Sequence, residues 1–165
     1  MTTHHTSYGT DSAPLSRTAM WFTILAFAVA WAWIAVTTPA WGDKWVFLAV
    51  LGAAAAVIAG LFLSWNRLIP RVSDRWIWTR SPEHRDYWTA PGNRAEFSRR
   101  LVTDLEWIGA ATLVLFTVLV LVVGSANGAP AQPWSLVLPI ALFAAGIVGL
   151  LLYMVVGPRY RPLAH

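Results

Sequence analysis

The sequence predicts an all-α integral membrane protein, a four-helix bundle with both termini in the cytoplasm. Three observations predict it. Hydrophobic residues make up 57% of the 165-residue chain and charged residues only 12%, four long stretches carry no charge, and the arginines lie outside those stretches. Soluble domains hold roughly a quarter charged residues, so this composition indicates a chain that is mostly surrounded by lipid.

Each uncharged stretch is long enough to cross a bilayer, which takes about 20 apolar residues. The four predicted spans are residues 18–38, 45–65, 107–125 and 134–156. Backbone groups in lipid must be satisfied within the segment, so each span should be a helix. The first span is too long for a signal-peptide core and Thr37–Ala40 is a poor cleavage site, so we expect it to be retained. The spans form one membrane domain, 18–157, between a disordered tail at 1–17 and a short tail at 158–165, both cytoplasmic.

The basic residues predict the orientation of the spans. All eleven arginines lie in the two tails or in the middle segment 66–106, whereas the loops 39–44 and 126–133 contain only Lys44. Basic residues concentrate on the cytoplasmic side of membrane proteins, so the tails and the middle segment should be cytoplasmic. Tryptophans at both ends of the spans agree, because indole rings prefer the headgroup level.

Small residues at four-residue spacing predict where the helices pack closely, as is usual in lipid. The second span offers one such face and the fourth span another: Gly52, Ala56 and Gly60, then Ala141, Ala145 and Gly149. We expect both faces to lie against neighbouring helices, and a homodimer along one of them is an alternative.

The spans contain no Asp, Glu, Lys, Arg or His, and this disfavours several chemistries. Proton-coupled transport usually requires an ionisable group at membrane depth, and a haem requires an axial ligand inside the bundle. The chain contains no cysteine, which excludes disulfides and thiol catalysis. We therefore predict no cofactor and no metal site. Trp31 and Trp33 lie deep in the first span; we interpret them as packing or lipid contacts, with a quinone or lipid-tail pocket as the alternative.

The first part of the middle segment, from Asn66 to Pro91, contains three prolines and predicts irregular structure. Its aromatic and basic stretch Arg75-Trp76-Ile77-Trp78 is typical of a segment at the lipid headgroups. Binding of a nucleic-acid backbone is the alternative, which the membrane-flanked position disfavours. The candidate contacts with lipid or a partner are Arg75, Trp76, Trp78, Arg80, Tyr87, Trp88 and Arg94.

The second part predicts a helical extension of the third span. Asn93 would cap the helix and Glu96, three residues later, has the spacing of a capping box. Apolar residues recur every four positions from Phe97, and Glu96–Arg100 and Arg100–Asp104 are spaced for ion pairs. We interpret the charges as a solvated face. The carboxylates are outnumbered by arginines that hold them ionised, so no enzyme is predicted.

The stretch Glu83-His84-Arg85-Asp86-Tyr87-Trp88 with Ala90-Pro91 carries a resemblance. Together with Arg94 and the helix through Trp107 and Gly109, it resembles the cytoplasmic loop of a family of small bacterial multi-span membrane proteins of unknown function, over about residues 66–160. Some members are similar to an immunity and signal-transduction membrane protein that protects a producing cell against its own membrane toxin. The loop 39–44 is shorter than in that family, and Gly92 and Asn93 replace an acidic and a basic residue. The family supplies no catalytic residue.

Together, these features predict a small non-enzymatic protein of the bacterial cytoplasmic (inner) membrane. Its role would be accessory, regulatory or immunity-like, through lipid or protein contacts of segment 66–106. The expected partners are membrane lipids and a membrane protein or a second copy, and not nucleic acid. The alternative is a non-catalytic structural subunit of a larger membrane assembly, such as a respiratory complex. A carrier for an apolar molecule is a weaker alternative.

Overall fold

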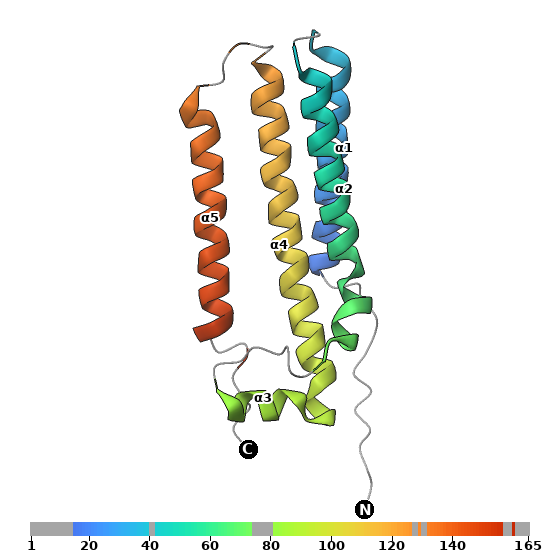
Figure 1. Cartoon of the computed structure of the whole chain (residues 1–165), viewed down its shortest axis with the longest axis vertical. Helices are drawn as coiled ribbons and strands as arrows, with labels where there is room; N and C mark the ends of the chain where they lie inside the picture. Colours follow the sequence, from blue (N-terminus) through green and yellow to red (C-terminus); the bar gives the residue numbers. More distant parts are fainter. Residues whose placement is uncertain are drawn as a thin grey trace, which may run out of the picture.

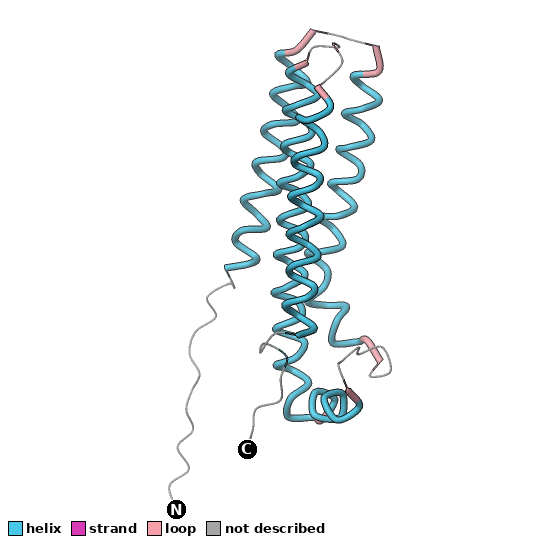
Figure 2. The backbone as a smooth tube through the Cα atoms, turned by 90° about the vertical axis from the view of Figure 1, so that its left-hand side faces the viewer, coloured by secondary structure: helices cyan, strands magenta, loops and turns pink. Residues whose placement is uncertain are grey.

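The structure is a computed structural model that describes residues 15–39, 42–73, 81–126, 129, 132–156 and 160. The described residues form helices and connecting turns, without a strand. The elements are α1 (Leu15–Thr37), α2 (Lys44–Leu68), the short 3₁₀ helix η1 (Ile69–Arg71), α3 (Pro82–Thr89), α4 (Pro91–Ser125) and α5 (Pro133–Val156) (Figure 1). The long helices run side by side, and α3 lies across one end of them (Figures 1 and 2).

Four helices in the described part of the chain are long and apolar enough to cross a membrane. They are α1, α2, α4 and residues Pro133–Met154 of α5. This confirms the prediction of an all-helical, multi-pass membrane protein. The first helix begins at Leu15, three residues before the predicted span, so that Ser16 and Arg17 belong to a helix and not to the tail. The rest of the predicted N-terminal tail, up to residue 14, lies outside the described residues.

The central helix is α4, which packs against α1, α2 and α5 (Figure 1). Buried side chains from three helices form the main core: Met20, Phe27 and Ile34 of α1, Leu48 and Ala55 of α2, and Ala110, Leu113 and Val120 of α4. By contrast, the Pro133–Met154 stretch of α5 contributes no buried residue. Lipid is as apolar as these side chains, so the exposed surface of α5 is compatible with a position at the edge of the membrane domain.

The two deep tryptophans of α1 have different surroundings. The indole N–H of Trp31 donates a 2.8 Å hydrogen bond to the carbonyl oxygen of Leu48 in α2. A Cβ atom on Gly52 would lie 3.2 Å from that indole nitrogen, so the glycine gives the ring room to approach. Trp31 therefore packs between two helices, whereas Trp33 is 63% exposed.

Among the described glycines, two in α4 lie closest to side chains of other helices. A Cβ atom on Gly109 would lie 2.6 Å from Cγ of Phe62 in α2, and one on Gly124 would lie 2.5 Å from Cγ2 of Ile34 in α1. Real Cβ atoms do not approach that closely. Side chains other than hydrogen at these two positions would therefore push α2 and α1 away from α4.

The small-residue faces predicted from the sequence lie elsewhere. Of the face on α2, Gly52 is against Trp31, while Ala56 and Gly60 are exposed; on α5, Ala141, Ala145 and Gly149 are all exposed. Apart from the adjacent residues and the nearby backbone of the same helix, no described atom lies within 4 Å of a Cβ atom built on Gly60 or Gly149. A neighbour on these faces stays a prediction, and it would have to come from outside the described residues of this chain.

Lys44, the only lysine of the chain, has a structural role. Its side chain is 2% exposed, and Nζ donates hydrogen bonds to the carbonyl oxygens of Ala35, at 3.0 Å, and Thr38, at 2.6 Å. The last carbonyls of a helix lack partners within it and carry a partial negative charge. The ammonium group therefore caps the end of α1, and it lies 5.1 Å from the ring centre of Trp45.

Two expectations about the middle segment are wrong. Residues Pro82–Thr89 form a helix where irregular structure was predicted, because Ser81 caps it by accepting a hydrogen bond from the backbone N–H of His84 and Pro82 occupies the first turn. The next helix begins at Pro91, not at Asn93, and its N-cap residue Ala90 has no side-chain cap. Proline is tolerated at the start of a helix, since its missing N–H would have no partner there. Both prolines therefore start helices and do not interrupt one.

Candidate functional site

The candidate contact residues that the structure describes, Tyr87, Trp88 and Arg94, belong to α3 and to the start of α4. Both elements lie at the same end of the molecule (Figures 1 and 2). We call this region, residues 15–17, 66–73, 81–106 and 160, the α3 end. It brings together the start of α1, the end of α2 with η1, the helix α3 and the first turns of α4. Tyr160, near the end of the chain, lies against them.

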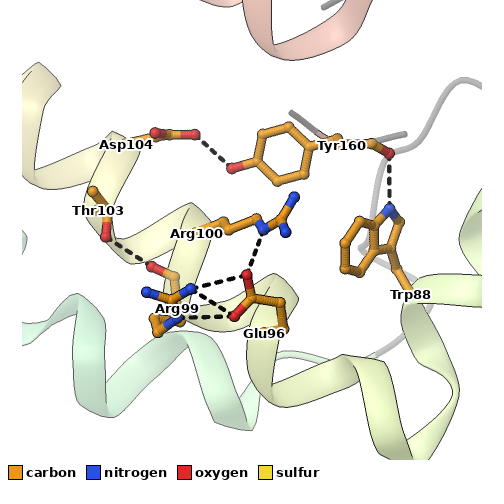
Figure 3. Close-up of polar contacts among 7 residues, drawn as sticks. All are labelled: Trp88, Glu96, Arg99, Arg100, Thr103, Asp104 and Tyr160. Atoms are coloured by element: carbon orange, nitrogen blue, oxygen red, sulfur yellow. Dashed lines mark hydrogen bonds and ion pairs between the residues drawn. The ribbon is translucent and has the colours of Figure 1, made fainter. Parts of the chain in front are cut away.

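Trp88 lies at the centre of a small hydrophobic cluster at the α3 end. The cluster contains Trp88, which is 2% exposed, and Phe97, with Tyr87, Leu101 and Tyr160 packed against them. The ring centres of Trp88 and Phe97 are 5.8 Å apart, and those of Phe97 and Tyr160 are 5.7 Å apart. The indole N–H of Trp88 donates a 2.9 Å hydrogen bond to the carbonyl oxygen of Tyr160 (Figure 3). The α3 end thus has a core of its own, separate from the core between the long helices.

Two buried carboxylates attach distant parts of the chain to α4. The hydroxyl of Tyr160 donates a 2.6 Å hydrogen bond to Asp104 (Figure 3), and the hydroxyl of Ser16 donates one of 2.6 Å to Glu106. Asp104 is 5% exposed and Glu106 is 2% exposed. Buried carboxylates are tolerated when they accept hydrogen bonds of this kind. These contacts connect the start of α1 and the residue Tyr160 to the same helix.

The burial of Asp104 and Glu106 corrects the interpretation of these charges as a solvated face. A signal in the sequence was available: residues two positions apart on a helix point in directions about 160° apart. The two acids therefore cannot share one solvent-facing side of α4. Their partners Ser16 and Tyr160 were missed, because no spacing pattern connects residues 90 or 56 positions apart.

Glu96 joins two arginines along the first turns of α4. Its carboxylate lies 2.8 Å from Arg99 and 2.6 Å from Arg100, which confirms the predicted Glu96–Arg100 pair and adds Arg99 (Figure 3). Hydrogen bonds from Arg99, assisted by those from Arg100, hold the pKa of the Glu96 carboxyl below its ordinary value. The Arg100 guanidinium also lies 5.4 Å from the ring centre of Trp88, so it connects the ion pairs to the aromatic cluster.

Asn93 and Arg94 connect the other pieces of the α3 end. The side-chain amide of Asn93 donates a 2.9 Å hydrogen bond to the carbonyl oxygen of Tyr87, which fixes the end of α3 on α4. The guanidinium of Arg94 donates to the carbonyl oxygen of Val72, just after η1. Asn93 therefore stabilises the α3–α4 corner, although it does not cap the helix as predicted.

An open groove of about 540 Å³ lies between the end of α2 and the start of α4. Its lining combines two arginines, polar side chains and three apolar ones: Asn66, Pro91, Arg94, Ala95, Ser98, Arg99, Val102 and Thr103. None of these lining residues is acidic.

The predicted contact residues divide into two groups. Arg75, Trp76, Trp78 and Arg80 lie outside the described residues. Tyr87 and Arg94 are half-buried and Trp88 is buried, so these three contribute to the internal structure of the α3 end. The ring of Trp88 faces Phe97 and Tyr160, not an outer surface.

Comparison of the chain with family models, curated proteins and solved structures found no match. The resemblance of the Tyr87-Trp88 stretch to a bacterial family therefore stays a prediction. Among the residues that the structure describes, no group of three or more acidic or histidine side chains is arranged to hold a metal ion.

Proposed function

We propose that the chain is a non-enzymatic accessory or regulatory protein of the bacterial cytoplasmic membrane, immunity-like in the sense of the resemblance. It acts by presenting its α3 end to a membrane protein partner. The observation that carries the proposal is the hydrophobic cluster around Trp88. A connector between two spans needs only a few residues. The segment between α2 and the membrane part of α4 instead has its own hydrophobic core, and its Trp88 is hydrogen-bonded to Tyr160 near the end of the chain. Such a construction fits a segment that must keep a fixed shape.

The surface that this core supports is the outer side of α3. Pro82, Glu83, Arg85 and Asp86 are all exposed, while Trp88 on the opposite side is buried. A short helix fixed at both ends, by Ser81 and by Asn93, presents these charges in a constant arrangement. A partner with complementary charges would bind this arrangement of charges specifically.

In this proposal the α3 end lies in the cytoplasm and both termini lie on the same side. The support is the distribution of basic side chains, because every described arginine belongs to the α3 end. The lysine at the opposite end caps α1, so its position has a structural explanation that is independent of membrane orientation.

Co-purification in mild detergent tests the proposed role. The wild-type chain is expected to retain a membrane protein partner, and the variant with Glu83→Lys and Arg85→Glu is expected to lose it. Arg71→Glu changes another exposed arginine outside α3 and serves as the control. The proposal fails if no partner accompanies the wild type, or if the α3 variant and the control retain it equally.

The structural-subunit alternative is favoured by one observation, the exposed small-residue face of α5 at Ala141, Ala145 and Gly149. Close backbone approach through small residues is how helices associate in lipid. A stoichiometric complex that survives the α3 changes, and is lost when Ala145 and Gly149 are replaced by leucine, would support this alternative over the regulatory one.

A further inference from the structure

We infer that the groove between the end of α2 and the start of α4 binds the phosphate of an anionic phospholipid headgroup. This lipid site goes beyond the proposed function, since its described lining residues belong to α2 and α4 and not to α3, and since it requires no protein partner.

The first argument is the position of the groove along the membrane axis. One wall is Asn66, which directly follows Trp65, and another is Thr103, one turn of α4 before Trp107. Tryptophan rings at the ends of membrane spans mark the headgroup level. The groove therefore begins on the polar side of that level, where lipid phosphates are concentrated.

The second argument is the chemistry of the lining. Arg94 and Arg99 contribute guanidinium groups, which recognise phosphate by paired hydrogen bonds. Asn66 and Ser98 add neutral donors, and none of the lining residues that the structure describes is acidic. Glu96 pairs with Arg99 and Arg100, and it is not among the described lining residues.

Arg99 can serve a headgroup while it keeps its ion pair. Its side chain is 75% exposed, and exposed ion pairs are weak. A guanidinium has five N–H donors, more than the two that Glu96 accepts from Arg99. A phosphate in the groove can therefore share this side chain with the glutamate.

The third argument is size and shape. A groove of about 540 Å³ falls within the range of small-molecule sites, about 300–1,000 Å³. That volume accommodates a phosphate with its glycerol group, while the acyl chains would remain in the bilayer. Pro91, Ala95 and Val102 provide apolar contacts for the glycerol carbons. Basic pockets beside membrane helices on the cytoplasmic side bind anionic lipid headgroups in this way.

The test measures binding of phosphatidylglycerol to the full chain in detergent, by native mass spectrometry and by thermal stabilisation. Two variants address the groove: Arg99→Gln removes a guanidinium, and Ala95→Phe fills the space at an exposed position without changing charge. Each is expected to weaken phosphatidylglycerol binding about tenfold, the order of one lost charge-assisted contact. Arg85→Gln removes an exposed arginine of α3 outside the groove, and it is expected to leave binding unchanged.

Three outcomes would overturn the inference. Equal binding by the wild type and both groove variants would show that the groove is not the site, and an equal loss in Arg85→Gln would show that only overall charge matters. Equal binding of phosphatidylcholine would exclude selection of an anionic headgroup. Inorganic phosphate is a separate arm: if it stabilises the wild type as much as phosphatidylglycerol does, the ligand is a free anion and not a lipid. None of these readouts depends on the partner tested by co-purification, so the two proposals fail independently.

Discussion

Single side chains at the α3 end connect parts of the chain that are far apart in sequence. Trp88 and Tyr160 are 72 residues apart, and Ser16 and Glu106 are 90 residues apart. The donor Trp88 is buried in the first contact, and both partners are buried in the second. Buried polar groups are costly unless they are paired, so these contacts specify how the pieces fit together, and losing one partner should be expensive.

Replacing Trp88 with alanine tests whether the aromatic cluster stabilises the α3 end. The change removes a buried ring and the hydrogen bond to Tyr160, and truncation of a buried tryptophan costs about 3 kcal/mol or more. Trp33→Ala removes a ring that is 63% exposed and serves as the control. Thermal unfolding in detergent should show a large loss for Trp88→Ala only, and amide hydrogen exchange should rise in α3. Similar losses in both variants would contradict the role of the cluster.

At the scale of elements, the sequence predicted well what depends on composition and poorly what depends on neighbours. The four spans were predictable, because length and lack of charge decide them. Helix α3 was not, because the prolines between Asn66 and Pro91 predict irregular structure, whereas Pro82 and Pro91 each start a helix. A proline interrupts a helix or begins it according to position, which composition alone does not reveal.

The packing of the helices shows the same limit. The four-residue spacing of small residues pointed to Gly60 and Gly149, which have open space beside them. It did not point to Gly109 and Gly124, the described glycines that lie closest to other helices. Small residues at this spacing identify a helix face that permits the close approach of another helix. Which helix approaches depends on partners such as Phe62 and Ile34, whose positions follow from the whole fold. The candidate site was predictable only as a segment, because Tyr160 comes from outside it.

Substitution of Gly109 by alanine tests the approach of α2 to α4. The added Cβ atom would lie 2.6 Å from Cγ of Phe62, near the root of that side chain, where small rotations give little relief. Overpacking of this kind costs about 1–3 kcal/mol. The matched control is Gly146→Ala on α5, where the Cβ atom meets nothing within 4 Å. Alanine favours a helix over glycine by about 1 kcal/mol, so the control should be neutral or stabilising in thermal unfolding. A stable Gly109→Ala protein would show that the contact with Phe62 is not tight.

At the scale of the whole molecule, the two ends differ in charge and in construction. The end that contains the connection between α1 and α2 has the turn around Gly42 and the buried Lys44, whereas the α3 end has every described arginine and a separate hydrophobic core. A chain with this asymmetry should insert in one orientation, because basic residues resist transfer across the membrane. The proposed partner contact and the inferred lipid site both require that orientation.

Cysteine labelling in intact cells tests the orientation directly. The chain has no cysteine, so a thiol reagent can label only the cysteine that a single replacement introduces. Arg85→Cys places a thiol on the exposed side of α3, and Gly42→Cys places one in the exposed turn at the other end of α2. An impermeant thiol reagent should label Gly42→Cys from outside and should label Arg85→Cys only after the membrane is permeabilised. The opposite pattern would invert the topology and place the arginines outside. Labelling of both from outside would mean that α2 does not cross the membrane, because the two positions flank that single helix.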